Sequence, residues 1–367
     1  MEHNMLTLDF WRDTVTYEGV TIPIGSIGCA ALNIPDDVIA ELDKLCEPLN
    51  RFMGTLNTGI PDSALLSAAR DGAIHILNIL NSVPPFSYLD KGFYAKGISD
   101  AFTQEGVQDF QAYTIAMLSG GLAAEHMEQY RRGILLARLT PVLAQLAFSL
   151  CDFKKEMTAF AEKLDARDID RTPEGLAEQF GRIFPPELSM TDDSSWMSLT
   201  NITVQYLSIV RPGYDVPMLV KRMHFVSFVG MFRADLFEGL CVGHAPKKCP
   251  ICGRWFLTTN ARHTKYCSGL APGDRLGRTC RQIGNLKGRE QRERAADHPV
   301  KQIYEKRMNT INRSVSRGNL DRETATAMKR LAKNKMLRAL SNSSYAQGDY
   351  EMEMEQDALL AEAGKQR

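Results

Sequence analysis

Apolar positions follow a helical period through most of the first two thirds of the chain. Residues 35–45 open with Pro-Asp-Asp and then place apolar side chains at spacings i, i+1, i+4 and i+7, which predicts one face of a helix. Similar helix starts lie at residues 61–63 and 172–174, and residues 106–165 are rich in Ala, Leu, Met and Glu. A further helix is predicted from about Val216 to Leu240. These patterns predict a mainly α fold.

Two other regions complete the predicted elements. Residues 5–31 alternate short β-prone runs with Gly and Pro, which indicates a small β element at the start of the chain. Apolar residues recur at helical spacing between 304 and 315, and Gly318-Asn319 would end that helix. Residues 328–339 predict a second amphipathic helix with a heavily basic opposite face. No internal repeat is visible.

Charge is distributed unevenly along the 367 residues, although the formal net charge is zero. Residues 246–340 contain 23 Lys and Arg against 7 Asp and Glu, a balance of +16, so the rest of the chain carries −16. The composition shifts at Gly243–Lys247, where Gly and Pro punctuate the preceding helix. We therefore predict a mainly helical domain of unknown ligand (1–245), a four-cysteine zinc module (246–295) and a basic helical extension with an acidic tail (296–367).

The sequence predicts neither a signal peptide nor a membrane-spanning helix. Its first residues contain early acidic side chains and no apolar run of signal-peptide length, and the most apolar later stretch, Phe225–Phe232, is too short to span a bilayer. We expect a cytoplasmic protein. In that compartment Cys29, Cys46, Cys151 and Cys241, which lie far apart in apolar surroundings, are expected to be reduced, buried thiols.

The other four cysteines are clustered. Cys249 and Cys252 form a Cys-x-x-Cys pair, a strand is expected at Arg254–Thr258, and a returning strand at Thr264–Cys267 would bring Cys267 back. Cys280 follows a Gly-rich loop, directly after Thr279, a candidate helix cap. Four thiolates satisfy a tetrahedral structural zinc ion and leave no open position, so we predict one zinc and no catalysis there. The predicted module is treble-clef-like or ribbon-like.

Other interpretations of the cluster stay open. A redox Cys-x-x-Cys normally lies between a strand and a helix of a βαβ unit, whereas a polar loop and two more cysteines surround this one. The long interval from Cys267 to Cys280 leaves His263 or His244 as substitute ligands, and Cys241 as a weaker substitute.

From Cys249 to Arg289 the sequence resembles the CGNR-type zinc fingers at the C-terminus of bacterial transcriptional regulators. The likeness rests on the Cys-x-x-Cys pair, Trp255-Phe256, Tyr266-Cys267 and Cys280-Arg281. It departs in the longer spacing between the last two cysteines and in Cys280-Arg281-Gln282, which stands where the family has Cys-Gly-Asn-Arg. The resemblance implies zinc and DNA binding, and it concerns about a tenth of the chain.

The basic side chains around the module predict contact with nucleic acid through its phosphates. DNA rather than RNA rests on the resemblance alone. Arg281 and Gln282 have suitable chemistry for reading bases, and helix capping or a contact to the cysteine sulfurs is an equal alternative for them. The predicted contacts are Lys247, Lys248, Arg254, Lys265, Arg275, Arg278, Arg281, Lys287, Arg289, Arg292 and Arg294.

No catalytic residue is predicted, because the chain lacks a phosphate-binding Gly-x-x-x-x-Gly-Lys loop, a His-Glu-x-x-His helix and a Gly-x-Ser-x-Gly elbow. The first expectation is a DNA-binding transcriptional regulator, with self-association left open. The alternatives are a zinc-stabilised protein-interaction module and a nucleic-acid-processing enzyme.

Overall fold

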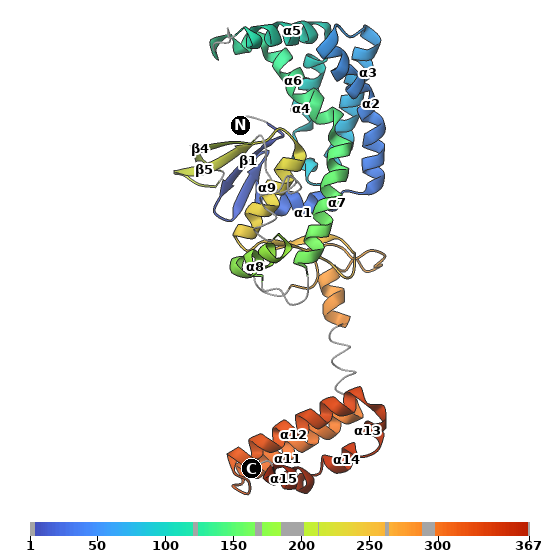
Figure 1. Cartoon of the computed structure of the whole chain (residues 1–367), viewed down its shortest axis with the longest axis vertical. Coiled ribbons are helices and arrows are strands. Elements are labelled where there is room, and N and C mark those ends of the chain that lie inside the picture. The colour runs from blue at the N-terminus through green and yellow to red at the C-terminus, as the bar shows by residue number, and fades with distance from the viewer. Residues whose placement is uncertain are drawn as a thin grey trace. The chain divides into compact units, whose positions relative to one another are not determined.

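The computed structural model describes residues 4–119, 124–165, 171–184, 202–211, 213–260, 264–287 and 298–365. By their internal contacts these residues form two units, 1–267 and 268–367. The fold is mainly α with a small sheet, as the sequence predicts (Figure 1). The division between the units comes directly after Cys267, within the sequence of the predicted zinc module. The predicted division into three domains stays a prediction.

The first unit contains a five-stranded antiparallel sheet with strand order β3-β2-β1-β5-β4. Its first three strands are the β element predicted at the start of the chain. The strands are β1 (Thr7–Trp11), β2 (Thr14–Tyr17), β3 (Val20–Pro23), β4 (Thr203–Val210) and β5 (Pro217–His224).

The helix predicted from Val216 to Leu240 is wrong over its first half. Residues 217–224 form β5, which lies between β1 and β4, and α9 begins only at Phe228, after its cap Ser227. Pairing on both sides and burial of Val220 and Met223 favour the strand. The alternating, β-branched sequence of β4 was also a strand signal, and it was missed.

Helices make up the rest of the first unit, and their starts agree with the predicted caps. Asp62 and Thr172 each accept a hydrogen bond from the backbone N–H three residues further on, as N-caps do. The helices are α1 (Ser26–Ala31), α2 (Asp36–Thr58), α3 (Ser63–Asn81), η1 (Phe86–Tyr88), α4 (Lys91–Ala101), α5 (Gln104–Leu118), η2 (Ala124–Tyr130), α6 (Arg131–Ala144), α7 (Leu146–Leu164), α8 (Pro173–Ile183) and α9 (Phe228–Cys241).

A buried carboxyl group joins α9 to the start of α1. The Asp235 side chain accepts hydrogen bonds from the backbone N–H groups of Gly25 and Gly28, both at 2.9 Å. Burial raises the pKa of Asp235 to about 7, although these N–H groups oppose the shift. A Cβ at Gly28 would lie 2.5 Å from the Phe232 carbonyl oxygen, so the two helices can approach this closely only with glycine there.

The second unit has its own small core, in which the two predicted basic helices pack together. Tyr350 is fully buried and its hydroxyl donates to the Val300 carbonyl oxygen at 2.8 Å. Lys335 forms ion pairs with Glu353 at 2.6 Å and Glu362 at 2.9 Å, so part of the acidic tail pairs with a basic helix. The elements are α11 (Pro299–Ser316), α12 (Arg322–Ser341), α13 (Ser343–Gln347), α14 (Tyr350–Glu353) and α15 (Gln356–Lys365).

Within the described ranges, no single helix has the length and apolar character needed to cross a membrane. One bent pair, Met127–Ala144 with Leu146–Leu164, meets the length and composition criteria when both parts are taken together.

Candidate metal centre and adjoining basic surface

The first two cysteines of the cluster lie in the turn of a short hairpin. Strands β6 (Ala245–Lys248) and β7 (Trp255–Thr258) are antiparallel, and Lys248 pairs with Trp255. The Cys249 carbonyl oxygen accepts from the N–H of Gly253 at 2.8 Å, and the Cys249 N–H donates to the Arg254 carbonyl oxygen at 2.9 Å. Gly253 has φ of 72°, a left-handed conformation that favours glycine. This turn places Cys249 and Cys252 together.

The returning strand predicted at Thr264–Cys267 is not formed. Strand β7 pairs with β6, which precedes it, rather than with the segment that follows. At Trp255 the backbone is also bound by the Asn33 side chain, whose oxygen accepts from the Trp255 N–H at 2.7 Å and whose amide donates to the Trp255 carbonyl oxygen at 2.9 Å. Cys267 therefore reaches the cluster from irregular backbone.

Cys280 begins a helix, as predicted, and residues 280–287 of that helix are described. The Thr279 hydroxyl accepts from the Gln282 N–H at 3.2 Å, and the Gln282 side-chain oxygen accepts from the Thr279 N–H at 2.8 Å. This reciprocal pair is a capping box. Gln282 thus has the capping role that was the alternative to base contact.

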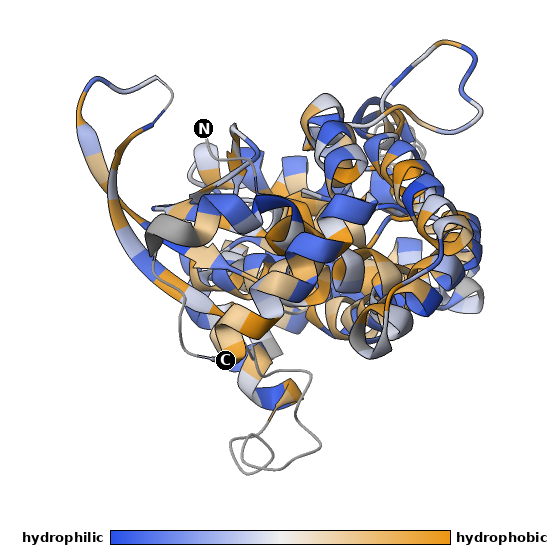
Figure 2. Ribbon diagram, turned by 90° about the horizontal axis from the view of Figure 1, so that it is seen from above, coloured by the Kyte–Doolittle hydropathy of each residue, from blue (hydrophilic) through white to orange (hydrophobic). Residues whose placement is uncertain are grey.

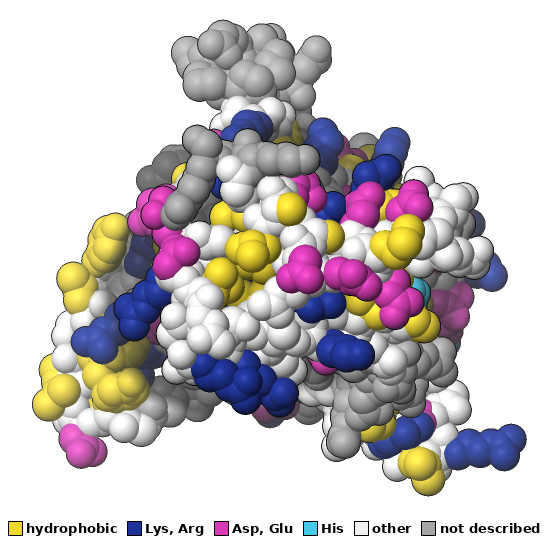
Figure 3. Space-filling view, turned by 90° about the horizontal axis from the view of Figure 1, so that it is seen from below, with side chains coloured by type: hydrophobic (Ala, Val, Ile, Leu, Met, Phe, Trp, Pro, Cys, Tyr) yellow, Lys and Arg dark blue, Asp and Glu magenta, His cyan; other side chains and the backbone are white. Residues whose placement is uncertain are grey.

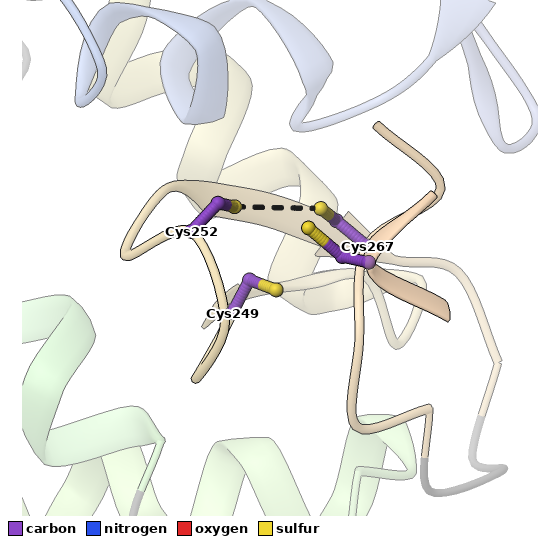
Figure 4. A group of neighbouring side chains, drawn as sticks. Cys249, Cys252 and Cys267 are labelled. Carbon is purple, nitrogen blue, oxygen red and sulfur yellow. Dashed lines mark hydrogen bonds between the residues drawn. The ribbon is translucent and has the colours of Figure 1, made fainter. Parts of the chain in front are cut away.

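The four predicted ligands converge. The sulfur atoms of Cys249, Cys252, Cys267 and Cys280 all lie within 4.8 Å of one another. The side chains of Cys249, Cys252 and Cys267 point toward a common centre (Figure 4). The Cys252 and Cys267 sulfurs are 3.6 Å apart. A tetrahedral site with metal–sulfur bonds of about 2.3 Å has sulfur–sulfur edges of about 3.8 Å, whereas a disulfide bond is about 2.0 Å long. The cluster could hold one metal ion.

The environment of Cys249 favours its thiolate. Burial raises the pKa of this thiol, but the backbone N–H groups of Cys252, Cys267 and Ile251, together with the Cys252 side chain, outweigh burial and lower the pKa to about 6. A thiolate is the form that binds metal. Without a cation, four thiolates at this separation would repel one another strongly.

Of the substitute ligands, His244 and Cys241 lie outside this group, and among the described residues only the four cysteines form a group that could hold a metal ion. The buried His244 ring has its Nδ1 2.8 Å from the Ile24 carbonyl oxygen. Cys241 is exposed near the end of α9. His263 lies outside the described residues.

The dispersed cysteines follow the prediction only in part. Cys29 and Cys46 are buried, as expected, whereas Cys151 and Cys241 are exposed. Apolar neighbours in sequence did not predict burial there, because each of these two positions lies on the outer face of its helix.

Three predicted phosphate contacts are held by acidic side chains. Lys247 lies 3.2 Å from Asp165 and Lys248 lies 3.2 Å from Glu162, both near the end of α7. Arg278 forms an ion pair with Asp274 at 2.6 Å. These pairs use part of the basic excess within the protein.

Other predicted contacts are exposed, and no ion pair among the described residues involves them: Arg254, Lys265, Arg275, Arg281 and Lys287. Arg289, Arg292 and Arg294 lie outside the described residues. On the face seen in Figure 3, Lys and Arg side chains are interspersed with acidic and hydrophobic ones.

The sequence did not predict the role of Arg171, which binds the β6–β7 hairpin through hydrogen bonds. Arg171, next to the helix cap Thr172, is buried and donates to Thr258 Oγ1 at 2.7 Å and to the carbonyl oxygens of Pro246 and Ala245 at 3.1 and 3.3 Å. It also pairs with Asp165 at 3.3 Å. Burial lowers the pKa of Arg171, and Asp165 opposes that shift. Nothing in the sequence near Arg171 indicated this contact.

Comparison with known protein families finds a match over the C-terminal part of the chain. Residues 197–366 match the model of a family of unknown function (DUF6076). The matched segment includes all four cysteines and the basic helices. No curated protein and no solved structure matches the chain.

Proposed function

We propose that this protein binds one structural zinc ion through Cys249, Cys252, Cys267 and Cys280, and that the basic surface beside the ion binds nucleic acid. The resemblance to CGNR-type zinc fingers favours DNA and a role as a transcriptional regulator. The observation that carries the proposal is the convergence of four sulfurs within 4.8 Å at the start of a basic helix.

The donor set fits zinc, with iron as the alternative. Four soft thiolates in a tetrahedral arrangement favour zinc or iron over the harder ions that prefer oxygen ligands. Four protein ligands leave no coordination position for water or substrate, so the ion would have a structural role. A zinc ion with four thiolates carries a formal charge of −2, which nearby Arg254, Lys265 and Arg281 would partly offset.

Metal content of the untagged protein tests the first half of the proposal. We expect one zinc per chain in the wild type, and loss of zinc in Cys252→Ser and Cys280→Ser. Cys241→Ser is the matched control, because Cys241 is exposed and outside the cluster. Bound iron, recognised by its visible absorption, would show that the centre holds iron and not zinc. Absence of metal from reduced protein would refute the centre.

Binding to a labelled DNA duplex, measured by anisotropy over a range of salt concentrations, tests the second half. The logarithm of affinity should fall linearly with the logarithm of salt concentration, with a slope of about −0.9 per phosphate neutralised. Arg275→Ala or Arg281→Ala should weaken binding and reduce the slope by about 1 if each contacts one phosphate. Arg182→Ala, an exposed position on α8, is the control. Salt-independent binding, or none, would refute this half.

A protein partner is the second candidate, and one observation favours it. Lys247 and Lys248 already pair with carboxylates at the C-terminal end of α7, so this basic surface accepts acidic protein groups. An acidic partner would be the better explanation if the zinc-loaded protein failed to bind DNA and RNA at low salt.

A further inference from the structure

Strand β4 forms one edge of the sheet, and within the described ranges no strand pairs with its outer side. Among the described residues it pairs only with β5. Its eight residues, TVQYLSIV, include no charged side chain, no Pro and no Gly. Soluble proteins normally protect such edges with Lys, Pro, a bulge or a covering segment, because unpaired N–H and C=O groups pair with other strands.

One face of the β4–β5 hairpin also exposes apolar side chains. Val204, Tyr206 and Val210 alternate along β4 and are 47%, 67% and 60% exposed. Leu219 of β5 lies opposite Ser208, on the same face, and is 67% exposed. Figure 2 shows hydrophobic and hydrophilic residues alternating along the long hairpin at the left of the view.

This apolar face continues the core. In the sheet register Val204 lies opposite Met223, which in turn lies opposite Leu8, and both Met223 and Leu8 are buried. The apolar surface thus extends from the core to an uncharged strand edge.

We propose that β4 pairs antiparallel with β4 of a second copy of this chain about a two-fold axis, which joins the two five-stranded sheets into one. Self-pairing suits this strand because its residues bring no like charges together across the axis. Because residues opposite each other across the two-fold axis face the same side of the joined sheet, at most seven of residues 203–210 pair with one another, and this antiparallel ladder supplies about six to eight hydrogen bonds, somewhat fewer than the roughly ten of a standard protein interface. The exposed apolar side chains of the two copies would meet on one face of the joined sheet. This dimer requires neither zinc nor nucleic acid.

Sedimentation of the full-length protein over a range of concentrations tests the dimer. We expect the wild type to sediment with twice the mass of the chain, and the double variant Val204→Lys/Tyr206→Lys to dimerise at least tenfold more weakly, because lysines on one copy would approach those on the other. Both side chains are exposed, so the fold should tolerate the change. Val20→Lys, on the opposite edge strand β3, is the matched control and should still dimerise.

Amide hydrogen exchange of the wild type gives a second test that needs no variant. Exchange in peptides covering residues 203–210 should slow as protein concentration rises through the dimerisation range, while exchange in β3 should not change. A monomer at all concentrations, a dimer unaffected by the two lysines, or exchange in β4 that is independent of concentration would each overturn the proposal.

Discussion

Replacing Arg171 by methionine should destabilise the first unit by about 3–5 kcal/mol. The change keeps an unbranched apolar side chain but removes three charge-assisted hydrogen bonds to the hairpin and the ion pair with Asp165. The Ala245 carbonyl oxygen keeps a bond from the Thr258 hydroxyl at 2.9 Å, whereas the Pro246 carbonyl oxygen loses the bond from Arg171. Breaking a buried pair by removing one partner typically costs about 3–5 kcal/mol.

Arg182→Met is the matched control for this prediction. Arg182 also pairs with a carboxylate, that of Glu178 at 2.5 Å, but both side chains are about two thirds exposed. An exposed pair of this kind contributes about 0–1 kcal/mol. The two variants therefore make the same chemical change in a buried and in an exposed setting.

Urea unfolding followed by far-ultraviolet circular dichroism would measure both effects. Amide exchange in peptides covering β6 and β7 would locate the effect of Arg171→Met, since exchange there should accelerate while exchange in α12 should not. If Arg171→Met lowered the free energy of unfolding by no more than Arg182→Met does, the idea that Arg171 fastens the hairpin would be refuted.

Three further predictions concern buried or half-buried polar groups. The pKa of Asp235 is raised to about 7 in the folded state from an ordinary 3.8, so folding takes up a proton between these pH values. The contribution of Asp235 to stability should therefore fall by up to about 4 kcal/mol as pH rises from 4 to 7. The difference in unfolding free energy between the wild type and Asp235→Asn should follow this trend across that window, and a constant difference would contradict it. Lys335→Met, which removes the ion pairs with Glu353 and Glu362, should lower the unfolding free energy of the second unit, measured by calorimetry, by about 1–3 kcal/mol, while the exposed Lys333→Met changes it little. Tyr350→Phe should cost about 1 kcal/mol through its lost hydrogen bond, and equal melting temperatures for wild type and variant would exclude that contribution.

Local signals predicted the helices and the cysteine cluster well. Asp62, Thr172 and Thr279 each begin a helix as their capping chemistry requires, and the Cys-x-x-Cys spacing placed two sulfurs in one turn. These features depend on residues close in sequence.

Non-local contacts account for what the sequence did not predict. Strand β5 forms because β1, more than two hundred residues away, pairs with it. The backbone of β7 at Trp255 is hydrogen-bonded by the Asn33 side chain, and the segment that follows β7 does not pair with it. The role of Arg171 likewise depends on partners more than seventy residues distant. Periodicity and spacing do not encode such contacts.

Because β1 lies in the middle of the sheet, the segment that matches the family model does not contain the whole sheet. The family match begins at residue 197, so it takes in β4 and β5 but none of the first three strands. Cut out at that position, the segment would leave one side of β5 without its partner and would lose Asn33 from the hairpin that carries Cys249. The matched residues alone therefore do not contain everything that this sheet and this hairpin require.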